Sequence, residues 1–116
     1  MSQIIDFANA SVTLLLNPVD MRFGYYRLAH IAQNVLNIDL RKGSHFVVFI
    51  SKKRDICKII HADEKGTVLI VRKLHAGRFE QFLAKADDPF GRPMSVQDLE
   101  QFFNGEPIYE KRMPLM

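Results

Sequence analysis

The residues with the clearest chemical potential are basic and lie in the middle of the chain. Ten Lys and Arg residues fall between Arg41 and Arg78 against three acidic residues, a net +7, whereas the whole 116-residue chain carries +3. Lys and Arg side chains neutralise DNA phosphates, and a basic segment between acidic flanks suggests a surface for a polyanion. The alternative is a solvated surface whose charge has no function. The candidate phosphate contacts are Arg22, Lys52, Lys53, Arg54, Lys58, Arg72, Lys73 and Arg78.

Two aromatic residues follow this basic segment closely. Phe79 and Phe82 have the side chains that stack on unpaired bases in single-stranded nucleic acid. Aromatic residues at this density are usually buried, however, and we expect both to pack in the core.

Other patterns of reactive side chains are weak. Cys57 and His61 share one face of a strand, but a strand cysteine usually behaves as a small apolar residue. An enzyme with His61 and Asp63 near a metal is a further alternative. The four histidines lack zinc-protease spacing, and the glycines form no phosphate-binding loop. We therefore expect no catalytic residue, no metal and no cofactor.

Four short segments have the composition of strands. They are rich in apolar and β-branched residues and are bounded by turn residues: residues 11–16, 46–50, 56–62 and 67–73. The last three are joined by short loops, one of them a hairpin turn at residues 63–66, which predicts antiparallel neighbours. Such a meander places the loop at residues 51–55 and the end of the strand at Lys73 at the same end of the sheet.

A long helix is predicted between the first two strands. Asp20 is a suitable N-cap, and apolar residues recur at helical spacing from Met21 to Leu36, which predicts about four turns ending near Asn37. Gly24 lies on the apolar stripe and is expected to allow close packing. A short second helix is predicted after the capping box that begins at Ser95, with a stop at Gly105.

These elements predict an α+β fold: a small antiparallel β-meander of three to four strands, one long helix packed on it and a short C-terminal helix. The length fits a single domain over residues 1–116, with a core of about residues 11–108 and a loose tail at residues 109–116. Residues 84–93, which contain two prolines and a glycine, are predicted to be a loop.

Composition excludes several classes of protein. The apolar content is too high and the net charge too low for a disordered chain. No apolar run approaches the length of a membrane span, and the N-terminus lacks the pattern of a secretory signal. The single cysteine excludes an internal disulfide and a cysteine-rich zinc module. We expect a cytoplasmic protein without a membrane partner.

Five motifs in order resemble a family of bacterial mobile-element proteins. They are the segment from Asp20 to Leu28, the strand at residues 46–49, the basic loop and strand at residues 52–60 with its hairpin, the segment at residues 72–79, and the helix and glycine at residues 95–105. Together they are similar to the TnpB-type accessory proteins encoded by the second open reading frame of insertion sequence 66 elements. The resemblance spans about residues 11–108.

The resemblance implies a non-catalytic accessory protein of DNA transposition that acts beside a separate transposase. The leading hypothesis is binding of double-stranded DNA at the element ends through the basic sheet end. The second is a module that binds the transposase without contacting DNA, with an exposed apolar patch around Phe79, Phe82 and Phe90.

Overall fold

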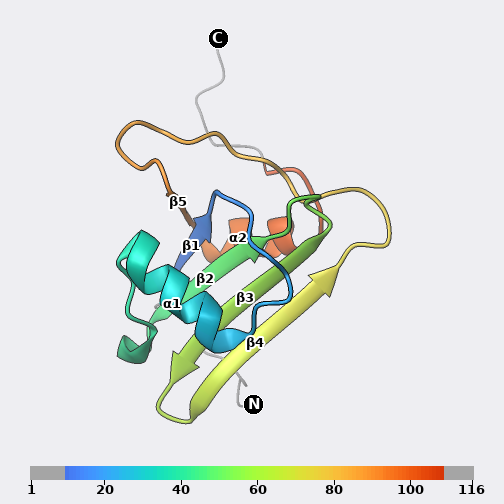
Figure 1. Ribbon diagram of the computed structural model, residues 1–116. Helices are drawn as coiled ribbons and strands as arrows, with labels where there is room; N and C mark the ends of the chain where they lie inside the picture. The colour runs from blue at the N-terminus through green and yellow to red at the C-terminus, as the bar shows by residue number, and fades with distance from the viewer. Residues whose placement is uncertain (1–9, 109–116) are drawn as a thin grey trace.

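The computed structural model describes residues 10–108, which form one five-stranded sheet with a helix on each face (Figure 1). The predicted tail at residues 109–116 lies outside the described part of the chain. The elements, in chain order, are β1 (Ser11–Leu15), α1 (Tyr25–Leu36), the 3₁₀ turn η1 (Leu40–Lys42), β2 (His45–Ile50), β3 (Ile56–Asp63), β4 (Gly66–Lys73), β5 (Gly91–Met94) and α2 (Val96–Phe103).

The strand order is β4-β3-β2-β1-β5. The predicted meander of β2, β3 and β4 is confirmed, with Val48 opposite Ile59 and Ile59 opposite Ile70. The prediction of a purely antiparallel sheet is wrong, because β1 runs parallel to β2, with Ser11 opposite His45. The connection between these strands contains α1, and a crossover through a helix brings the next strand back parallel.

The fifth strand was not predicted. The prediction of a loop over residues 84–93 is wrong at its end, because β5 begins at Gly91 and pairs antiparallel with β1. Pro93 is tolerated because β5 is an edge strand. Gly91 packs tightly: a Cβ atom there would lie 2.9 Å from a Leu36 methyl carbon and 3.1 Å from that of Thr13. Gly91 and Pro93 both have a low propensity for strands, which is why the sequence pattern predicts a loop here.

The two faces of the sheet carry separate cores. On one face α1 supplies Leu28 and Ala32, which pack against Val47, Phe49 and Ile60. On the other face α2 supplies its buried residues, Leu99 and Phe102, to a cluster of sheet residues that includes Phe46, Val48 and Ile59. The continuous apolar run of β2 is thereby explained, since alternate residues of this strand face opposite cores.

The start of the long helix differs from the prediction. Asp20 does not cap α1; its carboxylate accepts from the backbone N–H of Arg22 in the preceding turn. The N-cap is Gly24, where a Cβ atom would meet nothing within 4 Å, so the expected close packing at Gly24 is also wrong. The predicted helix end is correct, because Asn37 is the C-cap, with a left-handed φ of 57°.

The short helix follows its prediction closely. The Ser95 hydroxyl accepts from the backbone N–H of Asp98 at 3.0 Å, as the capping box requires. Gly105, two residues beyond Phe103, has a φ of +76°, which glycine adopts at little cost. The chain then continues to Ile108, whose N–H donates to the Glu80 carboxylate at 2.6 Å.

Candidate functional site

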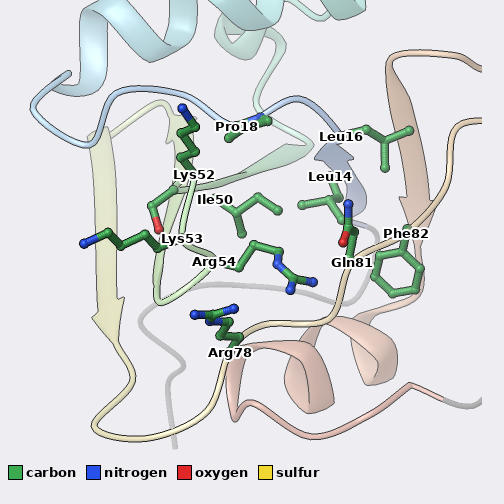
Figure 2. A pocket seen from close by; sticks show the side chains of 11 residues that line it. Leu14, Leu16, Pro18, Ile50, Lys52, Lys53, Arg54, Arg78, Gln81 and Phe82 are labelled. Atoms are coloured by element: carbon green, nitrogen blue, oxygen red, sulfur yellow. The ribbon is translucent and has the colours of Figure 1, made fainter.

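A groove of about 610 Å³ lies at the end of the sheet where β2 leads into β3 (Figure 2). Four of the eight predicted phosphate contacts line it: Lys52, Lys53, Arg54 and Arg78. The remaining lining is apolar or neutral, from Leu14, Leu16, Pro18, Ile50, Ser51, Gln81 and Phe82. The groove therefore combines a cationic rim with an apolar floor.

The loop that holds three of these cations is ordered by Ser51. Its hydroxyl donates to the Asp55 carboxylate at 3.0 Å and accepts from the backbone N–H groups of Asp55 and Ile56. The Arg54 N–H donates to the Ser51 carbonyl at 2.9 Å, and Arg54 takes a φ of 60°. These bonds turn the one acidic side chain of the loop toward Ser51, and Asp55 is absent from the groove lining.

Arg78 is brought to the same groove by the segment that follows β4. The backbone N–H of Phe79 donates to the Arg54 carbonyl at 2.7 Å, and the N–H of Leu74 donates to the Asp55 carbonyl at 2.9 Å. Phe79 is fully buried and stacks on Phe102 with 5.2 Å between ring centres. Figure 2 shows the side chains of Arg54 and Arg78 reaching into the groove from these two segments.

The four cations are uncompensated within the described part of the chain. Among residues 10–108, no side chain forms a salt bridge or a hydrogen bond with the side chains of Lys52, Lys53, Arg54 or Arg78. No acidic residue lines the groove. Like charges gathered on one groove create a positive potential that attracts an anion.

The other four candidates lie elsewhere or are already engaged. Arg22 forms a bidentate pair with Asp20, with a closest distance of 2.6 Å, and the Lys58 ammonium donates to the carbonyls of Met21 and Phe23 at 2.7 and 2.8 Å. Their predicted contacts with phosphate remain predictions.

Arg72 and Lys73 lie at the same end of the sheet as the loop, as predicted, since Lys73 pairs with Ile56. Neither of them lines the groove. The Arg72 guanidinium lies over the Phe103 ring, 4.3 Å from its centre, and donates to the Asn104 side-chain oxygen at 2.9 Å. Arg72 thus holds the end of α2 against β4.

The predictions for the phenylalanines have separate outcomes. Phe79 is a core residue, as expected, and Phe82 is partly buried in the same cluster while its side chain also lines the groove. The Arg92 guanidinium lies over the Phe82 ring at 4.2 Å. Phe90 is 49% exposed. An exposed patch made of Phe79, Phe82 and Phe90 is therefore contradicted by the burial of Phe79.

Sequence reasoning missed Gln81 and the floor from β1. The side chain of Gln81 points into the groove beside Leu14 (Figure 2). A signal for the floor was present, because the parallel pairing of β1 with β2 places the end of β1 next to the 51–55 loop. A sequence prediction in which β1 runs parallel to β2 would place Leu14 and Leu16 at the same end of the sheet as the 51–55 loop.

The residues considered for catalysis have structural partners. Burial raises the pKa of the Cys57 thiol to about 12, so this residue is a poor nucleophile at neutral pH. His61 is buried, stacks on Phe46 at 3.9 Å and bonds the His45 carbonyl through Nδ1. The Asp63 carboxylate accepts from two N–H groups of the hairpin turn. Within residues 10–108, no group of three or more His, Cys, Asp or Glu side chains is placed to hold a metal ion.

None of the helices in the described region is long and apolar enough to cross a membrane. No solved structure matches this chain. One curated relative, described as the uncharacterized protein y4hO of Sinorhizobium fredii (strain NBRC 101917 / NGR234), is 34% identical over 71 residues. The match covers 61% of this chain, and the chain spans 61% of the length of that relative.

The family model described as IS66 Orf2 like protein matches residues 10–112, nearly all of the chain and the whole of the sheet with both helices. The chain therefore belongs to the IS66 Orf2-like family.

Proposed function

We propose that this protein is a non-catalytic accessory factor of insertion-sequence transposition that holds double-stranded DNA at the element ends through the basic groove. The observation that carries the proposal is the set of four uncompensated cations on one groove, with no acidic residue in the lining. Such an activity would be exercised in the cytoplasm, where the element DNA is.

The arrangement suits contact with the phosphate backbone. The side chains of Lys52 and Lys53 extend away from the floor, whereas those of Arg54 and Arg78 point into the groove (Figure 2). Cations at several depths can meet phosphates along one strand, and such contacts fix the position of a protein on DNA without reading sequence. Four phosphate contacts predict a slope of roughly −3.6 for log affinity against log salt concentration.

The test is fluorescence anisotropy with labelled duplex DNA, titrated across salt concentrations. The inverted repeat of the parent element is compared with a scrambled duplex of equal length. The double variant K53E/R54E is compared with K42E/K65E, which changes the net charge equally. Lys42 and Lys65 lie in η1 and in the β3–β4 hairpin, at the opposite end of the sheet from the groove.

We expect K53E/R54E to weaken binding at least about 100-fold, since two attractive contacts become repulsive, and K42E/K65E to weaken it less than about threefold. Both variants should melt within a few degrees of the wild type, because the exchanged side chains form no salt bridge or hydrogen bond with the described residues 10–108. A preference for the inverted repeat would extend the proposal to recognition of the ends. Equal losses in the two variants, or no binding by the wild type at low salt, would contradict it.

A second candidate function is a module that binds the transposase without contacting DNA. The observation that favours it is strand β4, which forms an edge of the sheet and exposes Leu69 by 39% and Val71 by 53%. Exposed apolar side chains on a sheet edge are typical of protein interfaces. Co-purification of the transposase after nuclease treatment, lost in L69K/V71K and retained in K53E/R54E, would support this function over the first.

A further inference from the structure

The groove has a feature that contact with duplex phosphates does not require. Beside its four cations the groove is lined by apolar side chains, of which Leu16, Pro18 and Phe82 retain exposed surface. The bases of a duplex are stacked and paired inside it, so a phosphate strand lying across the rim would leave this floor in contact with water. Apolar surface left in water gives no binding energy.

An unpaired nucleotide presents a phosphate and an apolar base face together. Proteins that bind single strands combine a positive groove with aromatic side chains on which bases stack, and Arg guanidinium planes serve the same purpose. The groove contains both kinds of group, because Arg54, Arg78 and Phe82 all line it (Figure 2). Its volume of about 610 Å³ lies within the range of sites that enclose a small organic molecule.

The groups that line the groove are held firmly, as a binding platform requires. The Phe82 ring contacts the Arg92 guanidinium, 4.2 Å from the ring centre, and packs against the Phe102 ring, whose centre lies 6.2 Å away. Arg54 is fixed through its backbone to Ser51 and Phe79. The adjacent Gln81 side chain carries both a donor and an acceptor, which suits the edge of an unpaired base.

We propose that the groove binds one or two unpaired nucleotides of a DNA strand, as found at a frayed or single-stranded end. This inference rests on the proposed function and specifies the form of DNA that the same site takes. The phosphates contact the rim cations, and the base lies against the floor formed by Leu16, Pro18 and Phe82.

The experiment compares three labelled probes at one salt concentration: a blunt duplex, the same duplex with a four-nucleotide 3′ overhang, and the overhang strand alone. We expect the overhang and the single strand to bind about tenfold more tightly than the blunt duplex, the size of effect that base stacking gives. The variant F82L should lose this preference while keeping the duplex affinity and its salt slope. The matched control F90L, on the same segment but outside the groove lining, should keep the preference.

Phe82 also contacts the core, so the surface variant Q81A provides a second test that does not depend on folding. We expect Q81A to reduce the preference for unpaired DNA by about threefold and to leave the melting temperature unchanged. Equal binding of blunt and overhang probes by the wild type would overturn this inference and leave the proposed function standing. Failure to bind any of the three probes would overturn both.

Discussion

Two regions of the molecule use Arg and Lys in opposite ways. In the turns on either side of α1, Arg22 and Arg41 each pair with an aspartate two residues earlier, at 2.6 Å and 2.9 Å. In the groove, four cations have no acidic partner within the described residues. The comparison separates cations that hold the fold together from cations that are available to a ligand.

The difference arises from local sequence spacing. In Asp20-Met21-Arg22 and Asp39-Leu40-Arg41 the aspartate accepts the N–H of the arginine and then its guanidinium. In the groove loop the acid follows the cations instead of preceding them, and Ser51 bonds the Asp55 carboxylate. Arg22 and Arg41 carry the same charge as the groove cations, whereas the order of acid and base along the chain determines which charge remains free.

The largest effect on stability that we predict from this comparison is at Lys58. Its ammonium satisfies the Met21 and Phe23 carbonyls before α1, so Lys58→Met leaves both without this donor. Because hydrogen bonds from a charged group contribute more than neutral ones, we expect Lys58→Met to lower the free energy of unfolding by about 2 kcal/mol. In a domain of this size that lowers the melting temperature by about 10 °C. Thermal denaturation measures the change.

The matched control for Lys58 is Lys53→Met, which removes an unpaired groove cation. We expect its melting temperature to stay within about 2 °C of the wild type, since surface changes without partners have small effects. The effects on DNA affinity should be the opposite of those on stability: affinity should fall for Lys53→Met and stay unchanged for Lys58→Met. If Lys58→Met weakened DNA binding without lowering stability, Lys58 would belong with the groove cations.

A smaller effect is predicted at the end of β4, where neighbouring cations differ in the same way. Arg72 contacts Phe103 and Asn104, whereas Lys73 has no side-chain partner within residues 10–108. Arg72→Met should lower the free energy of unfolding by about 1 kcal/mol through loss of an exposed cation–π contact and a hydrogen bond. Urea unfolding of Arg72→Met beside Lys73→Met measures this, and equal midpoints for the two variants would refute it.

Much of the fold was predictable because its signals are local. The capping box at Ser95, the hairpin at residues 63–66 and the apolar run of β2 each depend on a few adjacent residues, and each is confirmed. The parallel pairing of β1 and the presence of β5 depend on contacts between distant segments. Gly91 and Pro93 form a strand because β1 offers an edge for pairing, and Leu36 leaves no room for a larger side chain at position 91.

The candidate site was predictable in part for the same reason. Lys52, Lys53 and Arg54 are adjacent in sequence, and the antiparallel meander was enough to place them together at the sheet end. Arg78 joins them through a backbone bond between Phe79 and Arg54, which no local pattern signals. The engagement of Lys58 with carbonyls more than 30 residues away is likewise a tertiary contact that charge counting does not predict.

The smallest predicted effect is the titration of the two paired aspartates. Side-chain hydrogen bonds from Arg22 lower the pKa of Asp20 from 3.8 to about 2, helped by the Arg22 backbone N–H, and Arg41 has the same effect on the pKa of Asp39. Because these pKa values are lower in the folded than in the unfolded chain, each pair adds stability that is fully present above about pH 4. That stability is lost as the pH falls toward 2.

Carboxyl carbon shifts followed by NMR as the pH is lowered measure both pKa values in one sample. In Arg22→Gln the pKa of Asp20 should rise toward 3.8 while that of Asp39 stays near 2, so the second pair serves as an internal control. A wild-type Asp20 that titrates near 3.8 would mean that Arg22 is not held by its neighbour. The charge of Arg22 would then be available to phosphate. Arg22 would belong with the free cations of the groove and not with the paired cations of the turns beside α1.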